Sequence, residues 1–246
     1  MLAASIFAIA LLAGASPAAS RGFVEIAGGT FQSTVRYDGD DGKRSVAAFA
    51  IATRAVTVRE FDEFVRTHPQ WAHDRVPSLL ADSGYLANWS HANPDAPVAH
   101  VSWFAADAYC TSIGARLPDW DEWEYVAAAD ATRSDARGDN TWLRRTFEDG
   151  TPRAMDARSG ASANIHGVSG MHGATWEWVG DYATLMGDAD KRGAENGDRL
   201  QFCGATGLSF ANRDDYATLK RVALLSAMEP RSTLGNLGFR CARSTP

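Results

Sequence analysis

Short strands and short amphipathic helices are the elements that the hydrophobic pattern of this chain predicts. Residues 23–31 alternate apolar and polar side chains before a Gly-Gly break, which is typical of a strand and turn. A second apolar stretch, over 46–51, predicts another strand. Thr57 and Glu60 have the spacing of a capping box and precede apolar residues at helical intervals. We therefore expect a helix over 57–65.

The rest of the chain alternates between helices and irregular stretches. The sequence predicts a helix from Trp103 to Ile113 that is capped by Ser102, a helix that is capped by Asp119 and runs to Ala129, and a helix over 217–225. Residues 66–97 and 130–163 are polar, lack periodicity and contain turn-forming residues, so we interpret both as long loops. Short strands combined with a few helices predict a fold of the α+β class.

The first twenty residues carry no charged side chain and include an apolar run over 3–12. This run is too short to cross a bilayer, and small residues typical of a cleavage site follow it. We interpret 1–20 as a secretory signal peptide, although a basic residue near its start is missing. A buried hydrophobic terminus or a wrongly assigned start is the alternative. Residues 21–246 then form a single domain, periplasmic or secreted, with no integral membrane segment after signal cleavage.

Composition narrows the classes of function. The 246 residues carry a net charge of −6 and their basic residues are scattered, so we expect no nucleic-acid partner. The 8 Trp and 22 Gly favour a loop-rich fold that is anchored by aromatic side chains. The 3 cysteines suit an oxidising compartment, as one disulfide and one remaining thiol.

Three blocks rich in aromatic and acidic residues are the most specific feature of the sequence. They read Arg-Leu-Pro-Asp-Trp-Asp-Glu-Trp-Glu-Tyr at 116–125, Gly-Val-Ser-Gly-Met-His-Gly-Ala-Thr-Trp-Glu-Trp at 167–178, and Leu-Gly-Phe-Arg-Cys at 237–241. In this order they resemble the formylglycine-generating enzyme (sulfatase-modifying factor) family. The resemblance implies a C-type-lectin-like α+β fold with small antiparallel sheets, two or three helices and long ordered loops. It also implies a structural disulfide between Cys110 and Cys241.

The cysteines decide which chemistry this resemblance supports. The well-studied enzymes of the family hold copper(I) between two nearby cysteines, because soft thiolates suit this soft ion. Counted back from the 237–241 block, the matching positions of this chain read Asn212 and Ala217. Cys203 is then the only remaining thiol, and one thiol cannot form a two-sulfur site, so we expect no copper cofactor. Cys203 itself is interpreted either as a buried thiol or as a reactive, catalytic one.

The 167–178 block also resembles a segment that can bind calcium in the family. The ligands in this chain would be the carbonyl oxygens of Gly173 and Thr175 and the carboxylate of Glu177. Gly170 stands where the family usually has Asp or Asn, so one side-chain ligand is missing. Calcium takes about six to eight oxygen ligands. We therefore expect at most a weakened calcium site.

Glu124 and Glu177 lie among tryptophans in these blocks, where a buried carboxylate has to be paired. Arg116 and Arg240 are the candidate partners. The alternative for Glu177 is a catalytic role as general acid or base.

Residues 208–230 depart from the sulfatase-activating branch and are closer to exported bacterial members found alongside copper nitrite reductases. The leading hypothesis is an accessory or maturation factor for another exported protein, such as a metalloenzyme. A surface groove floored by Trp176, Trp178 and the 203–207 loop would hold this client protein or peptide. Three alternatives stay open: a periplasmic oxidoreductase of different chemistry, like the branch that oxidises a pyoverdine precursor; a formylglycine-generating oxidase that uses Cys203 alone; and a lectin-like binding module. Whether the chain is an enzyme is therefore undecided by its sequence.

Overall fold

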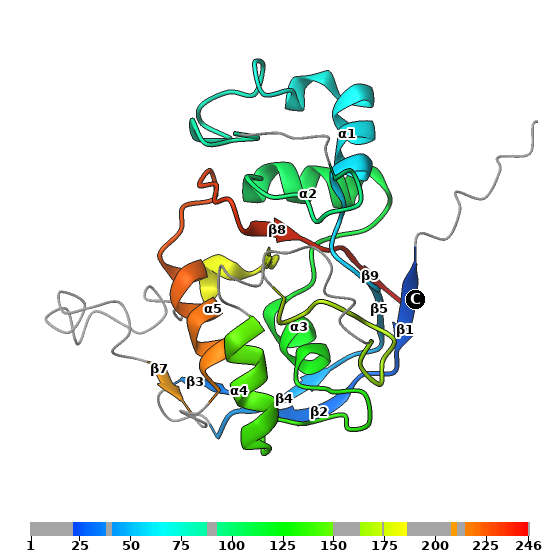
Figure 1. The fold of residues 1–246 in the computed structure, drawn as a ribbon, viewed down its shortest axis with the longest axis vertical. Coiled ribbons are helices and arrows are strands. Elements are labelled where there is room, and N and C mark those ends of the chain that lie inside the picture. The colour runs from blue at the N-terminus through cyan, green and yellow to red at the C-terminus, as the bar shows by residue number, and fades with distance from the viewer. Residues whose placement is uncertain are drawn as a thin grey trace, which may run out of the picture.

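The computed structural model describes residues 22–37, 41–87, 93–149, 163–173, 175–185, 208–210 and 215–245, and Figure 1 shows their arrangement. The strands are β1 (Phe23–Ile26), β2 (Gly29–Gln32), β3 (Val35–Tyr37), β4 (Lys43–Val46), β5 (Phe49–Ala52), β6 (Trp176–Trp178), β7 (Leu208–Phe210), β8 (Leu237–Phe239) and β9 (Ala242–Ser244). The helices are α1 (Val58–Thr67), α2 (Trp103–Ser112), α3 (Trp120–Ala127), α4 (Asn140–Asp149) and α5 (Tyr216–Ser226), with short 3-10 turns η1 (Pro69–Trp71) and η3 (Tyr182–Thr184). This mixture is the α+β class that the sequence predicts.

The strands form small sheets that join distant parts of the chain. β1, β5 and β9 form an antiparallel sheet in that order, so N-terminal strands pair with the C-terminal one. β2 pairs with β4 and β3 pairs with β7, both antiparallel, whereas β6 and β8 are parallel. The apolar stretch at 46–51 does not form one strand, as the pattern predicts, but is divided between β4 and β5.

The helix expected after Thr57 is confirmed as α1. The Thr57 hydroxyl accepts a hydrogen bond from the Glu60 amide, and the Glu60 carboxylate accepts one from the Thr57 amide. Phe61 on this helix is buried and stacks on Tyr109 of α2, with ring centroids 5.9 Å apart. The two helices form the upper end of the molecule in Figure 1.

α2 carries one half of the disulfide. It begins after Ser102, whose hydroxyl accepts a hydrogen bond from the Ala105 amide, as expected. Cys110 is bonded to Cys241 across a sequence separation of 131, with Cα atoms 5.6 Å apart. This confirms the pairing that the family resemblance implies. Closing a loop of this length restricts the unfolded chain, which stabilises the fold by about 5 kcal/mol in the chain-entropy model.

α3 and α5 lie toward the opposite end of the molecule from α1 (Figure 1). α3 starts after Asp119, as expected, and the Glu122 carboxylate accepts a hydrogen bond from the Asp119 amide at 2.9 Å. α5 starts after Asp215, whose carboxylate accepts a hydrogen bond from the Thr218 amide. The prediction of a helix over 217–225 is therefore confirmed.

α4 corrects the prediction that residues 130–163 form only a long loop. The Asp139 carboxylate accepts hydrogen bonds from the amides of Thr141 and Trp142 at 2.8 Å and 3.0 Å, which caps the first turn. The helix buries Trp142 and Leu143 on one side. A polar stretch with a few apolar residues therefore forms a helix because those residues have a core to pack against.

The parallel pair of β6 and β8 brings two of the sequence blocks together. Glu177 of β6 lies opposite Gly238 of β8. A Cβ atom added at Gly238 would collide with the carbonyl oxygen of Val98, which explains the glycine in the Leu-Gly-Phe-Arg block. The same pairing places Glu177 next to Arg240, which follows β8 directly.

Within the described segments, no helix combines the length and the apolar character needed to cross a bilayer. The predicted signal peptide, 1–20, lies outside the described residues, and so do Cys203 and the rest of the 203–207 loop.

Candidate functional site

Glu177, the carboxylate expected to be either paired or catalytic, is buried against Arg240. The Arg240 Nε atom donates to Oε2 at 2.7 Å, and Nη2 donates to Oε1 at 2.8 Å, so the ion pair is bidentate. The Trp123 indole donates a third hydrogen bond to Oε2 at 2.9 Å. Glu177 is 2% exposed and Arg240 is 0% exposed. Both carboxylate oxygens are thus engaged by buried donors, which favours a structural role.

Glu124 is also paired, but its partner is not one of the two arginines that the sequence suggested. Arg137 Nη1 donates to Glu124 Oε1 at 2.9 Å, and a hydroxyl and an amide from 33–34 donate to its two oxygens at 2.6 Å each. Arg116 instead forms a bidentate pair with Glu122. Burial raises the pKa of Glu124, while the Arg137 charge opposes that shift.

These pairs belong to a larger group of buried charges. The group consists of Glu124, Arg137, Glu177, Asp215, Arg221 and Arg240. Asp215 accepts a hydrogen bond from the Thr34 hydroxyl at 3.0 Å, and Arg137 donates to that same hydroxyl at 3.2 Å. Three carboxylates and three guanidiniums have formal charges that cancel, which limits the cost of removing them from water.

Arg221 and His172 pack on Trp123 within this group. The Arg221 guanidinium lies 4.8 Å from the Trp123 ring centroid, and it donates to the Met171 carbonyl at 2.7 Å. The His172 ring meets Trp123 edge-on at 5.9 Å, and its Nε2 atom lies 2.6 Å from the Ala127 carbonyl oxygen. Burial and then the Arg221 charge lower the pKa of His172 to about 4, so the imidazole is neutral at neutral pH.

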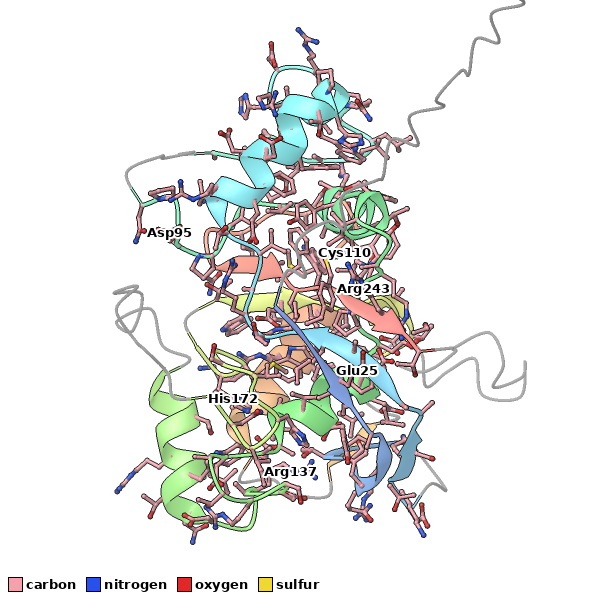
Figure 2. The ribbon with its side chains drawn as sticks, turned by 90° about the vertical axis from the view of Figure 1, so that its right-hand side faces the viewer. Glu25, Asp95, Cys110, Arg137, His172 and Arg243 are labelled. Carbon is pink, nitrogen blue, oxygen red and sulfur yellow. A yellow bond between two sulfur atoms is a disulfide. The ribbon has the colours of Figure 1, made fainter. Side chains whose placement is uncertain are left out.

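The Nδ1 atom of His172 and the Nε atom of Arg221 are buried without a hydrogen-bond partner in the described part of the chain. Burial lowers the pKa of Arg221 to about 10, which still leaves its guanidinium charged at neutral pH. Figure 2 shows His172 and Arg137 in the same half of the molecule, below Cys110. The buried charges extend from this half of the molecule to Arg240, which directly precedes Cys241 of the disulfide.

The groove expected over Trp176 and Trp178 needs a correction. Trp178 is 0% exposed and its indole donates to the Val101 carbonyl at 2.9 Å, so it cannot floor a surface groove. Trp176 is partly exposed, and the Lys220 ammonium lies 5.9 Å from its ring centroid. The third part of the expected groove, the 203–207 loop, lies outside the described residues. Of the two tryptophans, Trp176 is thus the one whose ring is partly exposed.

The residues expected to bind calcium do not fit a calcium site. Both oxygens of Glu177 accept hydrogen bonds from buried donors, and Gly170 offers no side-chain oxygen. The carbonyls of Gly173 and Thr175 would remain, which is far from the six to eight oxygens that calcium takes. Arg221 adds a positive charge to the same turn. Within the described ranges, no group of three or more His, Cys, Asp or Glu side chains could hold a metal ion.

A two-thiolate copper site does not fit this chain either. Two of its 3 cysteines form the disulfide, and both are buried. The remaining thiol, Cys203, lies outside the described residues. One thiolate is therefore the most that the chain could offer to copper(I), whereas a two-thiolate site needs two.

A polar pocket of about 280 Å³ lies next to β2 and β3. Arg137 lines it, but its Nε, Nη1 and Nη2 atoms donate to Asp135, Glu124, Thr34 and the Gln32 carbonyl. The guanidinium is thus committed to neighbours within the protein. The pocket is therefore explained by the packing of the buried charges and does not identify a ligand.

The site contains residues that sequence reasoning missed. Arg137 lies in a stretch without an obvious motif. Asp215 and Arg221 lie in 208–230, which carries the resemblance to exported members and predicts a helix, but from which no buried charge was expected. A signal for Arg221 does exist: it shares a face of α5 with Thr218, Val222 and Leu225, all of which are buried. A charged residue at helical spacing with apolar ones indicates a buried ion pair or ligand.

Comparison of the sequence with known proteins identifies the family to which the chain belongs. The model of the sulfatase-modifying factor enzyme 1-like domain matches residues 11–245. The formylglycine-generating enzyme of Bos taurus is 29% identical over an alignment of 270 residues, which covers 87% of this chain and 71% of that enzyme. That of Streptomyces coelicolor is 36% identical over 170 residues, covering 61% of this chain and 53% of the enzyme.

A third relative carries a different name. The inactive C-alpha-formylglycine-generating enzyme 2 of Mus musculus is 28% identical over 274 residues, covering 90% of this chain and 85% of that protein. The family model covers nearly the whole sequence, and the small antiparallel sheets with few helices agree with the C-type-lectin-like fold that the family implies. The chain belongs to the sulfatase-modifying factor family, whose relatives include formylglycine-generating enzymes.

Proposed function

We propose that this chain is a family member that does not generate formylglycine and that serves as an accessory or maturation factor for another exported protein. The observation that carries the proposal is the disulfide between Cys110 and Cys241. It uses two of the 3 cysteines, so Cys203 is the single thiol left for chemistry. The copper(I) chemistry that the family resemblance implies needs two thiolates.

The surroundings of Glu177 are a second support. A general base has to come within hydrogen-bonding distance of the group that it deprotonates. Glu177 is buried, and its oxygens accept hydrogen bonds from Arg240 and Trp123. These contacts argue against the alternative of a periplasmic oxidoreductase that would use Glu177 as its base.

The relatives are compatible with a loss of activity in this chain. The relative that is aligned over 90% of the chain is named inactive in Mus musculus. The match to the Streptomyces coelicolor enzyme spans 53% of that enzyme's length, so its full activity does not transfer with the alignment. Membership of the family therefore does not decide whether this chain is catalytically active, and the proposal depends on which residues the chain contains.

In this proposal the chain is exported after removal of 1–20 and works in the periplasm or outside the cell. Its partner is an exported protein or peptide, such as a metalloenzyme, and neither copper nor nucleic acid takes part. Trp176 is a suitable contact for a polypeptide because its ring is partly exposed and has the Lys220 ammonium beside it.

Aldehyde formation on a peptide that carries the sulfatase motif tests the proposal. The mature chain, given copper and oxygen, is expected to produce no aldehyde above the level without protein. The formylglycine-generating enzyme of Streptomyces coelicolor serves as the positive control, and a Cys203→Ser variant should behave like the unaltered chain. Aldehyde that forms with the unaltered chain and disappears with Cys203→Ser would show that the single thiol is catalytic and that the proposal is wrong.

A further inference from the structure

The turn that leads into β6 is held by two guanidiniums. Arg221 of α5 donates to the Met171 carbonyl at 2.7 Å, and Arg240 donates to the Ser169 carbonyl at 3.0 Å. The two carbonyls belong to the residues on either side of Gly170. Backbone carbonyls are also what a hard cation such as calcium binds. The positive charges that contact the carbonyls of this turn therefore come from two arginines of the chain itself.

Within the described part of the chain, Arg221 is the member of this pair that has no carboxylate in hydrogen-bonding contact. Arg240 is matched by Glu177 in a bidentate contact. Arg221 is 3% exposed, and its guanidinium lies over Trp123, whose indole in turn binds Glu177. The charges of Glu177 and Asp215 both act on it. Arg221 is thus a buried positive charge that offsets the negative charges of Glu177 and Asp215, as a bound metal ion would.

The formal charges around the turn balance without a metal. Glu177 and Asp215 supply two negative charges, and Arg221 and Arg240 supply two positive ones. A bound divalent cation would leave this buried group with a net charge of about +2, which is unfavourable away from water. Without Arg221 the group would instead be left with a net negative charge, which a cation would relieve.

We propose that Arg221 takes the place of a divalent cation at the 170–177 turn, so that the fold of this chain does not depend on calcium. Arg240 offsets one of the two negative charges of Glu177 and Asp215, and the guanidinium of Arg221 offsets the other. It also donates to the backbone carbonyl of Met171, next to Gly170 in the same turn.

Gly170 provides the means to test this exchange. Its φ angle is +73°, and a Cβ atom added to it would meet nothing within 4 Å. Asn adopts this left-handed conformation more readily than other side chains do. A Gly170→Asn substitution would therefore restore an oxygen ligand at little cost to the fold.

Thermal unfolding of the unaltered mature chain is the first experiment, and it does not depend on whether a variant folds. The Tm is expected to be the same in excess EGTA and in calcium chloride at about 1 mM, which would load a site of the extracellular type. Magnesium chloride at the same concentration controls for ionic strength. A ligand that binds the folded state raises its stability. A Tm that rises with calcium and not with magnesium would overturn the proposal.

The second experiment removes the charge. Arg221→Met keeps most of the side-chain volume and is expected to lower the Tm by roughly 6–20 °C, because it leaves a buried carboxylate charge uncompensated. Arg221→Lys is the matched control, which keeps the charge and should lose less. An Arg221→Met variant with the Tm of the unaltered chain would overturn the proposal.

The third experiment restores the metal ligand. Gly170→Asn alone is expected to show no response to calcium, because Arg221 still occupies the turn. Combined with Arg221→Met, it should create a response, seen as a Tm several degrees higher in calcium than in magnesium. A calcium response of Gly170→Asn alone would show that Arg221 does not exclude the ion, and the proposal would fail.

Discussion

Replacing Glu177 with Gln is expected to lower the free energy of unfolding by about 3–5 kcal/mol. The substitution keeps the size of the side chain but removes the charge that faces Arg240. Arg240 is 0% exposed, so its guanidinium would stay buried without a carboxylate in contact. Denaturant-induced unfolding, followed by tryptophan fluorescence, measures the loss.

Glu229→Gln is the matched control for this substitution. Glu229 pairs with Arg231 at 2.8 Å, but the two side chains are 66% and 50% exposed, and such pairs contribute at most about 1 kcal/mol. Replacing both buried partners, Glu177→Leu with Arg240→Met, should cost less than the two single losses added together. If Glu177 is a catalytic group that the fold tolerates at some cost, Glu177→Gln would instead leave stability unchanged or raise it.

Removing the disulfide is also expected to have a large effect on stability. A chain with both Cys110→Ala and Cys241→Ala is expected to lose about 2–5 kcal/mol of stability, because its unfolded state regains the freedom of a long loop. Both cysteines are buried, so the packing of their neighbours also suffers. Denaturant unfolding of the double variant, beside the unaltered chain, gives the difference.

A Cys203→Ser chain is the control for the disulfide, because it changes the remaining cysteine and keeps the bond. Its stability should be close to that of the unaltered protein. Peptide mapping of the unreduced protein should recover Cys110 linked to Cys241 and Cys203 as a free thiol. A linkage that includes Cys203 would refute both the pairing and the expected stability loss.

Local signals in the sequence were sufficient for the elements that begin with a cap. Thr57, Ser102 and Asp119 each precede a helix that starts where it was expected. A capping side chain and the amides that it binds lie within three residues of each other, so the signal is contained in the local sequence. Asp139 gives the same signal for α4, but the polar stretch around it hid the helix.

Contacts between distant residues could not be derived in this way. Arg116 is closer to Glu124 in sequence than Arg137 is, yet the chain returns after α3 to bring Arg137 against Glu124. Trp178 was expected at a surface, but the pairing of β6 with β8 places it in the core. Such outcomes depend on how separate segments pack, which the residue pattern of one segment does not contain.

Two contacts between distant residues could still be predicted, the disulfide and the pairing of Glu177 with Arg240. The family resemblance made this possible because it indicates which distant segments lie together. The role of Arg221 could not be predicted, since it departs from what that resemblance implies for the 170–177 turn. Its side chain had to be seen against Met171 and Trp123 before its charge could be related to the missing calcium ligand at Gly170.

Copper(I) binding tests most directly whether this chain lacks the two-thiolate site. The mature protein, with its disulfide intact, is titrated with copper(I) in competition with a chromophoric chelator, beside the Streptomyces coelicolor relative. We predict that the chelator retains the copper at every ratio and that Cys203→Ser changes nothing. Transfer of one copper(I) ion per chain from the chelator to the unaltered protein, lost in Cys203→Ser, would contradict the claim.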